Sequence, residues 1–194
     1  SALLCGSLWA NFATMRTAGS CNILLVLLLL CSFPAHSKPV HYSFISNWEI
    51  KAPLKDVWDL IDKGEDWHVW WRSVVKTKIV KSGTPDGLGQ IIHYTWKSYL
   101  PFTLTIDFKI TGKKLYQEIR GESTGDLLGT GVWTFAEIDG ITYIQYQWEV
   151  VSTKKFVNFL SLFLKRFFTH NHNVIMHRGA KGLAKELHSK LISG

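Results

Sequence analysis

The body of this 194-residue chain has no cysteine. All three cysteines of the sequence, Cys5, Cys21 and Cys31, lie near the N-terminus, and none follows them. The remainder of the chain can therefore form no disulfide and no thiolate metal site, and it offers no cysteine nucleophile. Its stability has to come from packing and hydrogen bonding.

Patterns that would indicate a metal site or a catalytic triad are also lacking. The sequence has eight histidines, but His170, His172 and His177 lack the i, i+4 spacing that places two imidazoles on one helix face. No cysteine or carboxylate cluster completes a ligand set, and no Ser/His/Asp grouping indicates a triad. We expect no metal ion, no cofactor and no assigned catalytic residue.

The positive charge is too modest and too scattered to indicate nucleic acid. The formal net charge is +7, and it becomes +6 without the first 37 residues, which contribute only Arg16. No stripe of Lys and Arg alternates with aromatic residues along a predicted strand. The charge is compatible with an anionic membrane surface or an acidic ligand, and we expect no nucleic-acid partner.

The first 37 residues have the layout of a signal peptide. Met15-Arg16 precedes an apolar run from Ile23 to Leu30, and the small residues of Ala35-His36-Ser37 mark a cleavage point before Lys38. The apolar stretch is shorter than the roughly 20 residues of a spanning helix. We predict a leader over 1–37 and one domain over 38–194, exported to the periplasm or secreted; the alternative is an uncleaved membrane anchor.

What the body has in abundance is aromatic residues in alternating patterns. The chain contains nine Trp, eleven Phe and six Tyr, enough for a real core. Alternation of apolar and polar residues predicts strands over 40–50, 74–81, 89–97, 102–110, 115–122, 130–138 and 141–151. Turn signals separate them, among them Gly112-Lys113 and Asp139-Gly140. Leu54–Ile61 has helical spacing after Pro53, and a second short turn carries three tryptophans.

The C-terminal segment, from about Lys155 onward, is predicted to be helical with two apolar stripes. One stripe consists of Phe156, Phe159, Leu160, Phe163, Leu164 and Phe167. The other, about half a turn away, consists of Met176, Leu183, Leu187 and Leu191. Since the polar run Thr169–Asn173 lies between them, we expect a break or kink there.

This order of elements resembles the SRPBCC superfamily, which includes START domains, the birch-pollen allergen (Bet v 1-like) fold and the polyketide cyclase/dehydrase-like proteins. Several motifs look like landmarks of the last group: Trp48-x-Ile50-x-Ala52-Pro53-x-x-x-Val57-Trp58, Trp67-x-x-Trp70-Trp71, Gly125-Asp126-Leu127-x-Gly129, Gly140-x-Thr142, Tyr146-x-Trp148 and Asn171-His172-Asn173-x-x-Met176-x-x-Gly179-x-x-Gly182-Leu183. The resemblance implies an α+β helix-grip fold, with a seven-stranded curved antiparallel sheet around a long C-terminal helix and two short helices after the first strand. It says little about activity.

Rings gather on the predicted concave face of the sheet. The alternation turns six aromatic side chains inward, and they predict the wall of a ligand cavity or, equally well, a filled core: Tyr94, Trp96, Phe108, Trp133, Tyr146 and Trp148. Five further aromatics are candidates for an entrance or gate, although packing alone explains the tryptophans as well: Trp67, Trp70, Trp71, Phe163 and Phe167.

Two charged residues, Arg120 and Glu118, are candidates for a polar anchor. They alternate on one strand face, where Arg120 could bind a carboxylate or phosphate if that face is concave. If the face is convex, the same residues form solvated ion pairs.

Three functions fit these observations. The first is non-catalytic binding, with or without transport, of a lipid-like or polycyclic molecule. The second is a cyclase or dehydratase that uses the same cavity, with His93 acting as acid or base beside Tyr94 or Glu118. The third is a membrane-surface module that binds through the Phe-rich helix 156–168.

Overall fold

The structure is a computed structural model that describes residues 40–98, 102–153 and 155–194, with backbone alone for 155–165. Lys38–Gly194 form one compact unit. The predicted leader lies outside the described residues, so its cleavage and the predicted export or anchoring stay predictions. Within the described part of the chain, no helix is long and apolar enough to span a membrane.

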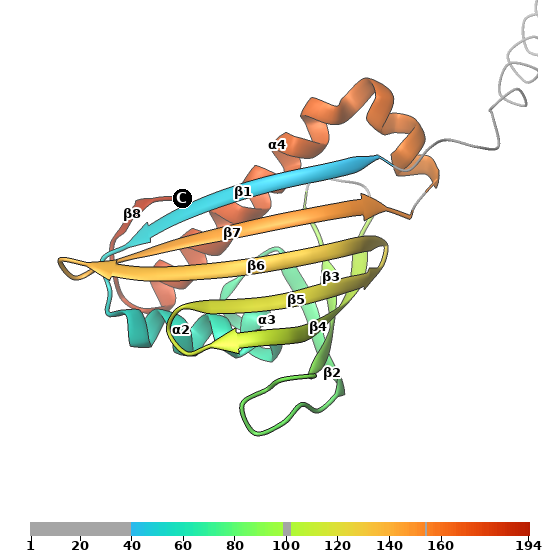
Figure 1. The fold of residues 1–194 in the computed structure, drawn as a ribbon. Helices are drawn as coiled ribbons and strands as arrows, with labels where there is room; N and C mark the ends of the chain where they lie inside the picture. The colour runs from blue at the N-terminus through green and yellow to red at the C-terminus, as the bar shows by residue number, and fades with distance from the viewer. Residues whose placement is uncertain (1–39, 99–101, 154) are drawn as a thin grey trace, which may run out of the picture. The chain divides into compact units, whose positions relative to one another are not determined.

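A single curved antiparallel sheet and one long helix dominate the fold (Figure 1). Neighbouring strands follow the order β2-β3-β4-β5-β6-β7-β1-β8. The strands are β1 (His41–Ile50), β2 (Val74–Lys81), β3 (Ile91–Trp96), β4 (Leu104–Lys114), β5 (Glu118–Gly125), β6 (Leu127–Ile138), β7 (Ile141–Ser152) and β8 (Leu191–Ser193). The helices are α2 (Leu54–Asp62), the 3-10 turn η1 (Gly64–Asp66), α3 (Trp67–Trp70) and α4 (Lys155–Glu186).

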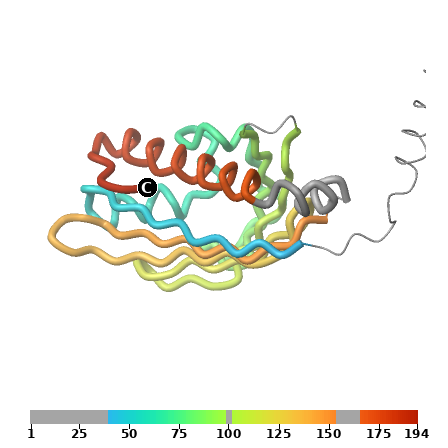
Figure 2. Tube along the Cα trace, turned by 90° about the horizontal axis from the view of Figure 1, so that it is seen from above, coloured from blue at the N-terminus to red at the C-terminus, as the bar shows by residue number. Residues whose placement is uncertain are grey.

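The predicted α+β helix-grip fold is confirmed, with one strand more than expected. Figure 2 shows α4 running over the sheet. The extra strand is β8, in which Leu191 lies instead of continuing the helix; it pairs with the end of β1 through Glu49 and Ile50. The chain turns back at His188, which has φ 49°. A strand of three residues is too short to show an alternating pattern, so it could not be predicted from the sequence.

The two predicted turns had different outcomes. Asp139-Gly140 joins β6 to β7, and both residues have positive φ, as a two-residue type I′ hairpin requires. Gly112-Lys113 is not a turn, and that prediction was wrong. Strand β4 continues through these residues to Lys114, and the pairing register with β5 shifts between Ile110 and Gly112. A bulge, rather than a reversal, accommodates the glycine.

Of the predicted break or kink in the C-terminal helix, the break is contradicted. Helix α4 continues without interruption through Thr169–Asn173, where Asn171 and His172 are buried. The two apolar stripes differ because they contact different neighbours. Phe168 lies edge-on to the ring of Tyr42 on β1, whereas the following turns of α4 pack against α3. Of the polar residues between the stripes, Asn171 and His172 face the interior.

Small residues let α4 pack closely against α3. A Cβ atom at Gly179 would meet the indole of Trp71, and one at Gly182 would meet the backbone carbonyl of Trp70, in both cases well inside 3.0 Å. The indole N–H of Trp71 donates to the carbonyl of Ile175 on α4 at 2.9 Å. These contacts fix the helix over the concave face and determine where its buried polar residues lie.

Candidate ligand-binding cavity

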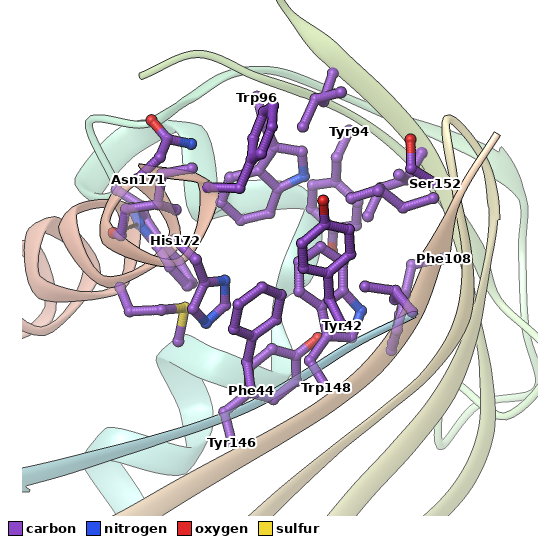
Figure 3. A pocket seen from close by; sticks show the side chains of 18 of the residues that line it. Tyr42, Phe44, Tyr94, Trp96, Phe108, Tyr146, Trp148, Ser152, Asn171 and His172 are labelled. Carbon is purple, nitrogen blue, oxygen red and sulfur yellow. Dashed lines mark hydrogen bonds between the residues drawn. The ribbon is translucent and has the colours of Figure 1, made fainter. Parts of the chain in front are cut away.

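A cavity separates α4 from the concave face of the sheet. Its volume is about 100 Å³, several times the roughly 10–15 Å³ that one water molecule needs. The side chains around it come from β1, β3, β4, β6, β7 and α4 (Figure 3). The interior is therefore not closed by its own rings.

The structure brings all six of the predicted wall residues together around this space: Tyr94, Trp96, Phe108, Trp133, Tyr146 and Trp148. Strand alternation and register explain their meeting. Trp133 of β6 lies opposite Tyr146 of β7 in the pairing, and their rings stack with centroids 4.2 Å apart. Trp148 follows two residues later on the same face, 6.3 Å from Tyr146. Their binding of a ligand stays a prediction.

A pair of glycines, overlooked in the sequence, makes room for two of these rings. Gly121 of β5 and Gly131 of β6 are direct cross-strand partners. A Cβ atom at Gly121 would overlap the ring of Phe108, and one at Gly131 would lie 2.6 Å from the hydroxyl of Tyr146. The rings lie against bare backbone, which leaves space above them. The occurrence of a glycine on each of two neighbouring predicted strands could have indicated this space from the sequence.

The polar part of the wall comes from α4, and the sequence did not assign it. His172 is 6% exposed. Its imidazole stacks on the ring of Phe44 at 4.0 Å and lies 5.7 Å from the indole of Trp148 (Figure 3). Nε2 lies 3.4 Å from the hydroxyl of Ser46. Burial lowers the pKa of His172 to about 4, because an apolar environment disfavours the imidazolium. The histidine is neutral at physiological pH.

Asn171 precedes His172 and ties α4 to the end of β3. Its side-chain carbonyl accepts a hydrogen bond from the hydroxyl of Ser98, just after the strand. Both Asn171 and His172 line the cavity. The polar run that was predicted to interrupt the helix thus supplies an amide and an imidazole to an otherwise aromatic wall.

Tyr94 and Tyr146 are also held neutral. Burial raises the pKa of each phenol above its ordinary value, and for Tyr94 the nearby Glu65 carboxylate adds to the effect. Neither hydroxyl can ionise near neutral pH, so each acts as a neutral polar group.

The three tryptophans of the predicted gate are packed in place. Trp67, Trp70 and Trp71 are all buried, and the indole N–H of Trp67 donates to the carbonyl of Ile61 at 2.9 Å. Trp67 and Trp71 line the cavity, whereas Trp70 does not. Trp67 and Trp71 thus belong to the cavity wall, and Trp70 and Trp71 pack against α4. A gate role for these tryptophans stays a prediction.

The two phenylalanines of the predicted gate lie elsewhere. Phe167 is 43% exposed and does not line the cavity; its neighbour Phe168 does. The helical register was therefore assigned one residue off. The side chain of Phe163, like those of most of the Phe-rich helix 156–168, lies outside the described residues, so its gate role and the membrane-surface hypothesis stay predictions.

The predicted polar anchor is not in the cavity. Glu118 and Arg120 form an ion pair at 2.9 Å, and the Arg120 side chain is 54% exposed. Strand β5 turns Ile119 and Gly121 inward, so Glu118 and Arg120 lie on its outer face. The ion pair lowers the pKa of Glu118 and raises that of Arg120.

Loss of this ion pair should leave the cavity unchanged. We expect Arg120→Ala to bind any cavity ligand with an affinity within about twofold of the parent protein, because exposed ion pairs contribute little to stability. Equilibrium titration of the two proteins with the same ligand checks this. A tenfold loss of ligand affinity would show that Arg120 takes part in binding.

The acid–base pair considered for His93 does not form. His93 lies on the outer face of β3, where its Nδ1 is 2.6 Å from a carboxylate oxygen of Asp107, its cross-strand partner. Tyr94, the next residue, points to the opposite face and lines the cavity. Strand β4 separates His93 from Glu118 on β5. A reaction inside the cavity could not use His93.

We expected no Gly-x-Ser-x-Gly nucleophile elbow, but residues Gly121–Gly125 match this pattern. In hydrolases it marks a serine at a sharp strand-to-helix turn. Here it lies within strand β5, and Ser123 is buried with its hydroxyl unbonded among the described residues. No described side chain forms a hydrogen bond with Ser123 that could activate it as a nucleophile, so the pattern does not mark a catalytic serine here. Among the described residues, no group of His, Cys, Asp and Glu could hold a metal ion.

No protein-family model matches the sequence, and no curated protein sequence does either. Solved structures do match. The aromatase/cyclase Zhui of Streptomyces sp. R1128 superposes with a TM-score of 0.64 at 11% identity, covering 77% of this chain and 94% of that one. A START superfamily protein of Mycobacterium smegmatis gives 0.62 at 11% identity, covering 77% and 98%. The chain has the START-like helix-grip fold.

A third solved structure with this START-like fold is an enzyme with a different activity. The norcoclaurine synthase of Thalictrum flavum gives a TM-score of 0.53 at 13% identity, covering 77% of this chain and 97% of that one. The predicted resemblance to the START-like and cyclase-like superfamily is thus confirmed for the fold. Because the identities are so low and the two enzymes among these structures have different activities, the START-like fold assigns no residue role, and function has to be argued from the cavity.

Proposed function

We propose that this protein binds an apolar, ring-containing small molecule, lipid-like or polycyclic, in the cavity under α4, and so sequesters or carries it. One observation supports this above the others: open volume persists among stacked rings on the concave face, where a core without a ligand would close. Ligand pockets are typically concave and mostly apolar, with few polar groups. Aromatic walls provide large contact area to a flat ligand.

Binding is favoured over catalysis by the state of the titratable groups. A cyclase or dehydratase of this fold would need a proton acceptor inside the cavity, and His172 is the histidine that lines it. A general base works best when its pKa is near the working pH. The pKa of His172 is about 4, and those of Tyr94 and Tyr146 are raised. These groups can orient a ligand but exchange protons poorly at neutral pH.

A bulky side chain that fills the cavity should prevent a ligand from binding there. N-phenyl-1-naphthylamine, an uncharged fluorophore that brightens in apolar sites, serves as the probe. Leu127 lines the cavity, whereas its neighbour Leu128 is exposed on the other face of β6. We expect Leu127→Trp to weaken probe binding at least tenfold by occupying the space, and Leu128→Trp to leave it within twofold. Fluorescence titration measures both, and circular dichroism verifies the fold.

Two results would contradict the proposal. Either the parent protein fails to bind the probe and also purifies without any apolar molecule detectable by native mass spectrometry, or Leu127→Trp and Leu128→Trp bind the probe equally. The second result would place the probe on the outer surface.

A further inference from the structure

The charge of the cavity wall restricts its ligand. None of the described residues that line the cavity is Asp, Glu, Lys or Arg. A carboxylate or phosphate inside would therefore lack a counter-charge, and a buried charge without a partner is strongly disfavoured. The ion pairs of the described chain lie on other faces, among them Glu118–Arg120 and His93–Asp107. An uncharged molecule suits this wall.

Several polar atoms of the wall have no hydrogen-bond partner among the described residues; the indole N–H groups of Trp96 and Trp148 can only donate, whereas the imidazole of His172 offers a second ring nitrogen. His172 is more than nine-tenths buried, and Ser46 approaches its Nε2. No described residue makes a hydrogen bond to the other ring nitrogen, Nδ1. The imidazole stacks on Phe44 and lies close to the indole of Trp148, which restricts its rotation. A ring nitrogen without a protein partner in an apolar wall gains free energy from a ligand that forms a hydrogen bond with it.

A hydroxyl group is the ligand group that fits Nδ1 in either tautomer. If Nε2 accepts from Ser46, Nδ1 carries the proton and donates; if Nε2 donates, Nδ1 accepts. A hydroxyl can both donate and accept, whereas a carbonyl or an ammonium can do only one. The aromatic wall around His172 supplies contact for the ring that would carry this hydroxyl.

Resting on the proposed function, we infer that the cavity takes an uncharged ring compound with a hydroxyl group, and that this hydroxyl bonds to Nδ1 of His172. The ligand class is narrower than apolar molecules in general, because it excludes fatty acids and phospholipids whose charged groups would enter the cavity. The same contact gives His172 a role in specificity without requiring it to transfer a proton.

Three molecules with one ring system test the inference at pH 7.5. Naphthalene, 2-naphthol and 2-naphthoate are each titrated against the parent protein loaded with N-phenyl-1-naphthylamine, and displacement of the fluorophore gives their affinities. We expect 2-naphthol to bind roughly two- to tenfold more tightly than naphthalene, the gain of one hydrogen bond. We expect 2-naphthoate to bind at least tenfold more weakly than 2-naphthol, because its charge is uncompensated.

A variant isolates the contribution of Nδ1. His172→Phe keeps an aromatic ring beside Phe44 and removes both nitrogens, so 2-naphthol should lose its advantage over naphthalene while naphthalene binds within twofold of before. His170→Phe removes an exposed imidazole two residues away on α4 and should keep the parent ratio. If His172→Phe does not fold, the three affinities of the parent protein still test the charge and hydroxyl preferences.

The outcomes separate the inference from the proposed function. Binding of 2-naphthoate as tight as that of 2-naphthol overturns the uncharged ligand. Equal binding of 2-naphthol and naphthalene, or an advantage that survives in His172→Phe, overturns the contact with His172. If the fluorophore binds but none of the three displaces it, the inference fails while the cavity remains a binding site. If the fluorophore itself does not bind, the proposed function fails.

Discussion

The melting temperature is expected to fall by about 5–10 °C when Gly182 is replaced by alanine. The new methyl group would meet the backbone carbonyl of Trp70 well inside 3.0 Å, and neither partner can rotate away. Relief requires α4 to move off α3, which would open the packing around Trp70 and Trp71. Overpacking of this kind costs about 1–3 kcal/mol or more, which exceeds the gain of up to about 1 kcal/mol in helix propensity.

Two further variants serve as a comparison and a control for Gly182→Ala. Gly179→Ala meets a tryptophan side chain rather than backbone, so a small ring shift can absorb part of the overlap and the loss should be smaller. Lys181→Ala changes an exposed residue between the two glycines and should shift stability by less than about 0.5 kcal/mol. Thermal melts followed by circular dichroism rank the three. Equal melting temperatures for Gly182→Ala and the parent protein would show that α4 does not approach α3 so closely.

The fold could be predicted from the sequence because its signals are local and repeated. Period-two alternation in β1 and β7, the Asp139-Gly140 turn and the helical spacing after Pro53 each act within a few residues. The predictions of secondary structure are wrong where a contact between residues far apart in the sequence determines the structure. The bulge at Gly112 depends on pairing with β5, and β8 exists because the end of β1 is available to pair with it.

The candidate site was predictable only in its aromatic half. Inward-facing rings follow from strand alternation, so Tyr94, Trp133 and Tyr146 were found. Whether rings fill a space or surround it depends on their volumes and on what lies opposite, which no local pattern contains. The glycine pair Gly121–Gly131 makes that difference here.

The polar half of the site was missed because a polar residue within a helix normally faces water. Asn171 and His172 interrupt an apolar stripe, and interruption was interpreted as a break in the helix. Their burial follows from the close packing of α4 on α3, which orients the preceding turns of α4 toward the sheet. Only the tertiary arrangement distinguishes a polar residue in a cavity from one at a kink.

Acidification should destabilise the protein through His172. Its pKa is about 4 in the folded state and about 6.5 when unfolded. Between these values the unfolded chain binds a proton that the folded chain does not, so stability rises with pH across this window and falls as pH is lowered from about 6.5 to 4. Above the window the residue is neutral in both states and contributes no pH dependence. The full loss is about 3 kcal/mol, at roughly 1.4 kcal/mol for each pH unit.

Urea unfolding of matched variants isolates this contribution from the carboxylates, which also titrate near pH 4. His172→Phe keeps a ring against Phe44 and removes the titration, so the stability difference between the parent protein and His172→Phe should move by about 2–3 kcal/mol against the parent from pH 6.5 to 4.5. His170→Phe, which removes an exposed imidazole of the same helix, should track the parent at every pH. A constant difference for His172→Phe would mean that the imidazole reaches water or a counter-charge in the folded state. The cavity wall would then be able to hold a charge, and the preference for an uncharged ligand would lose its physical basis.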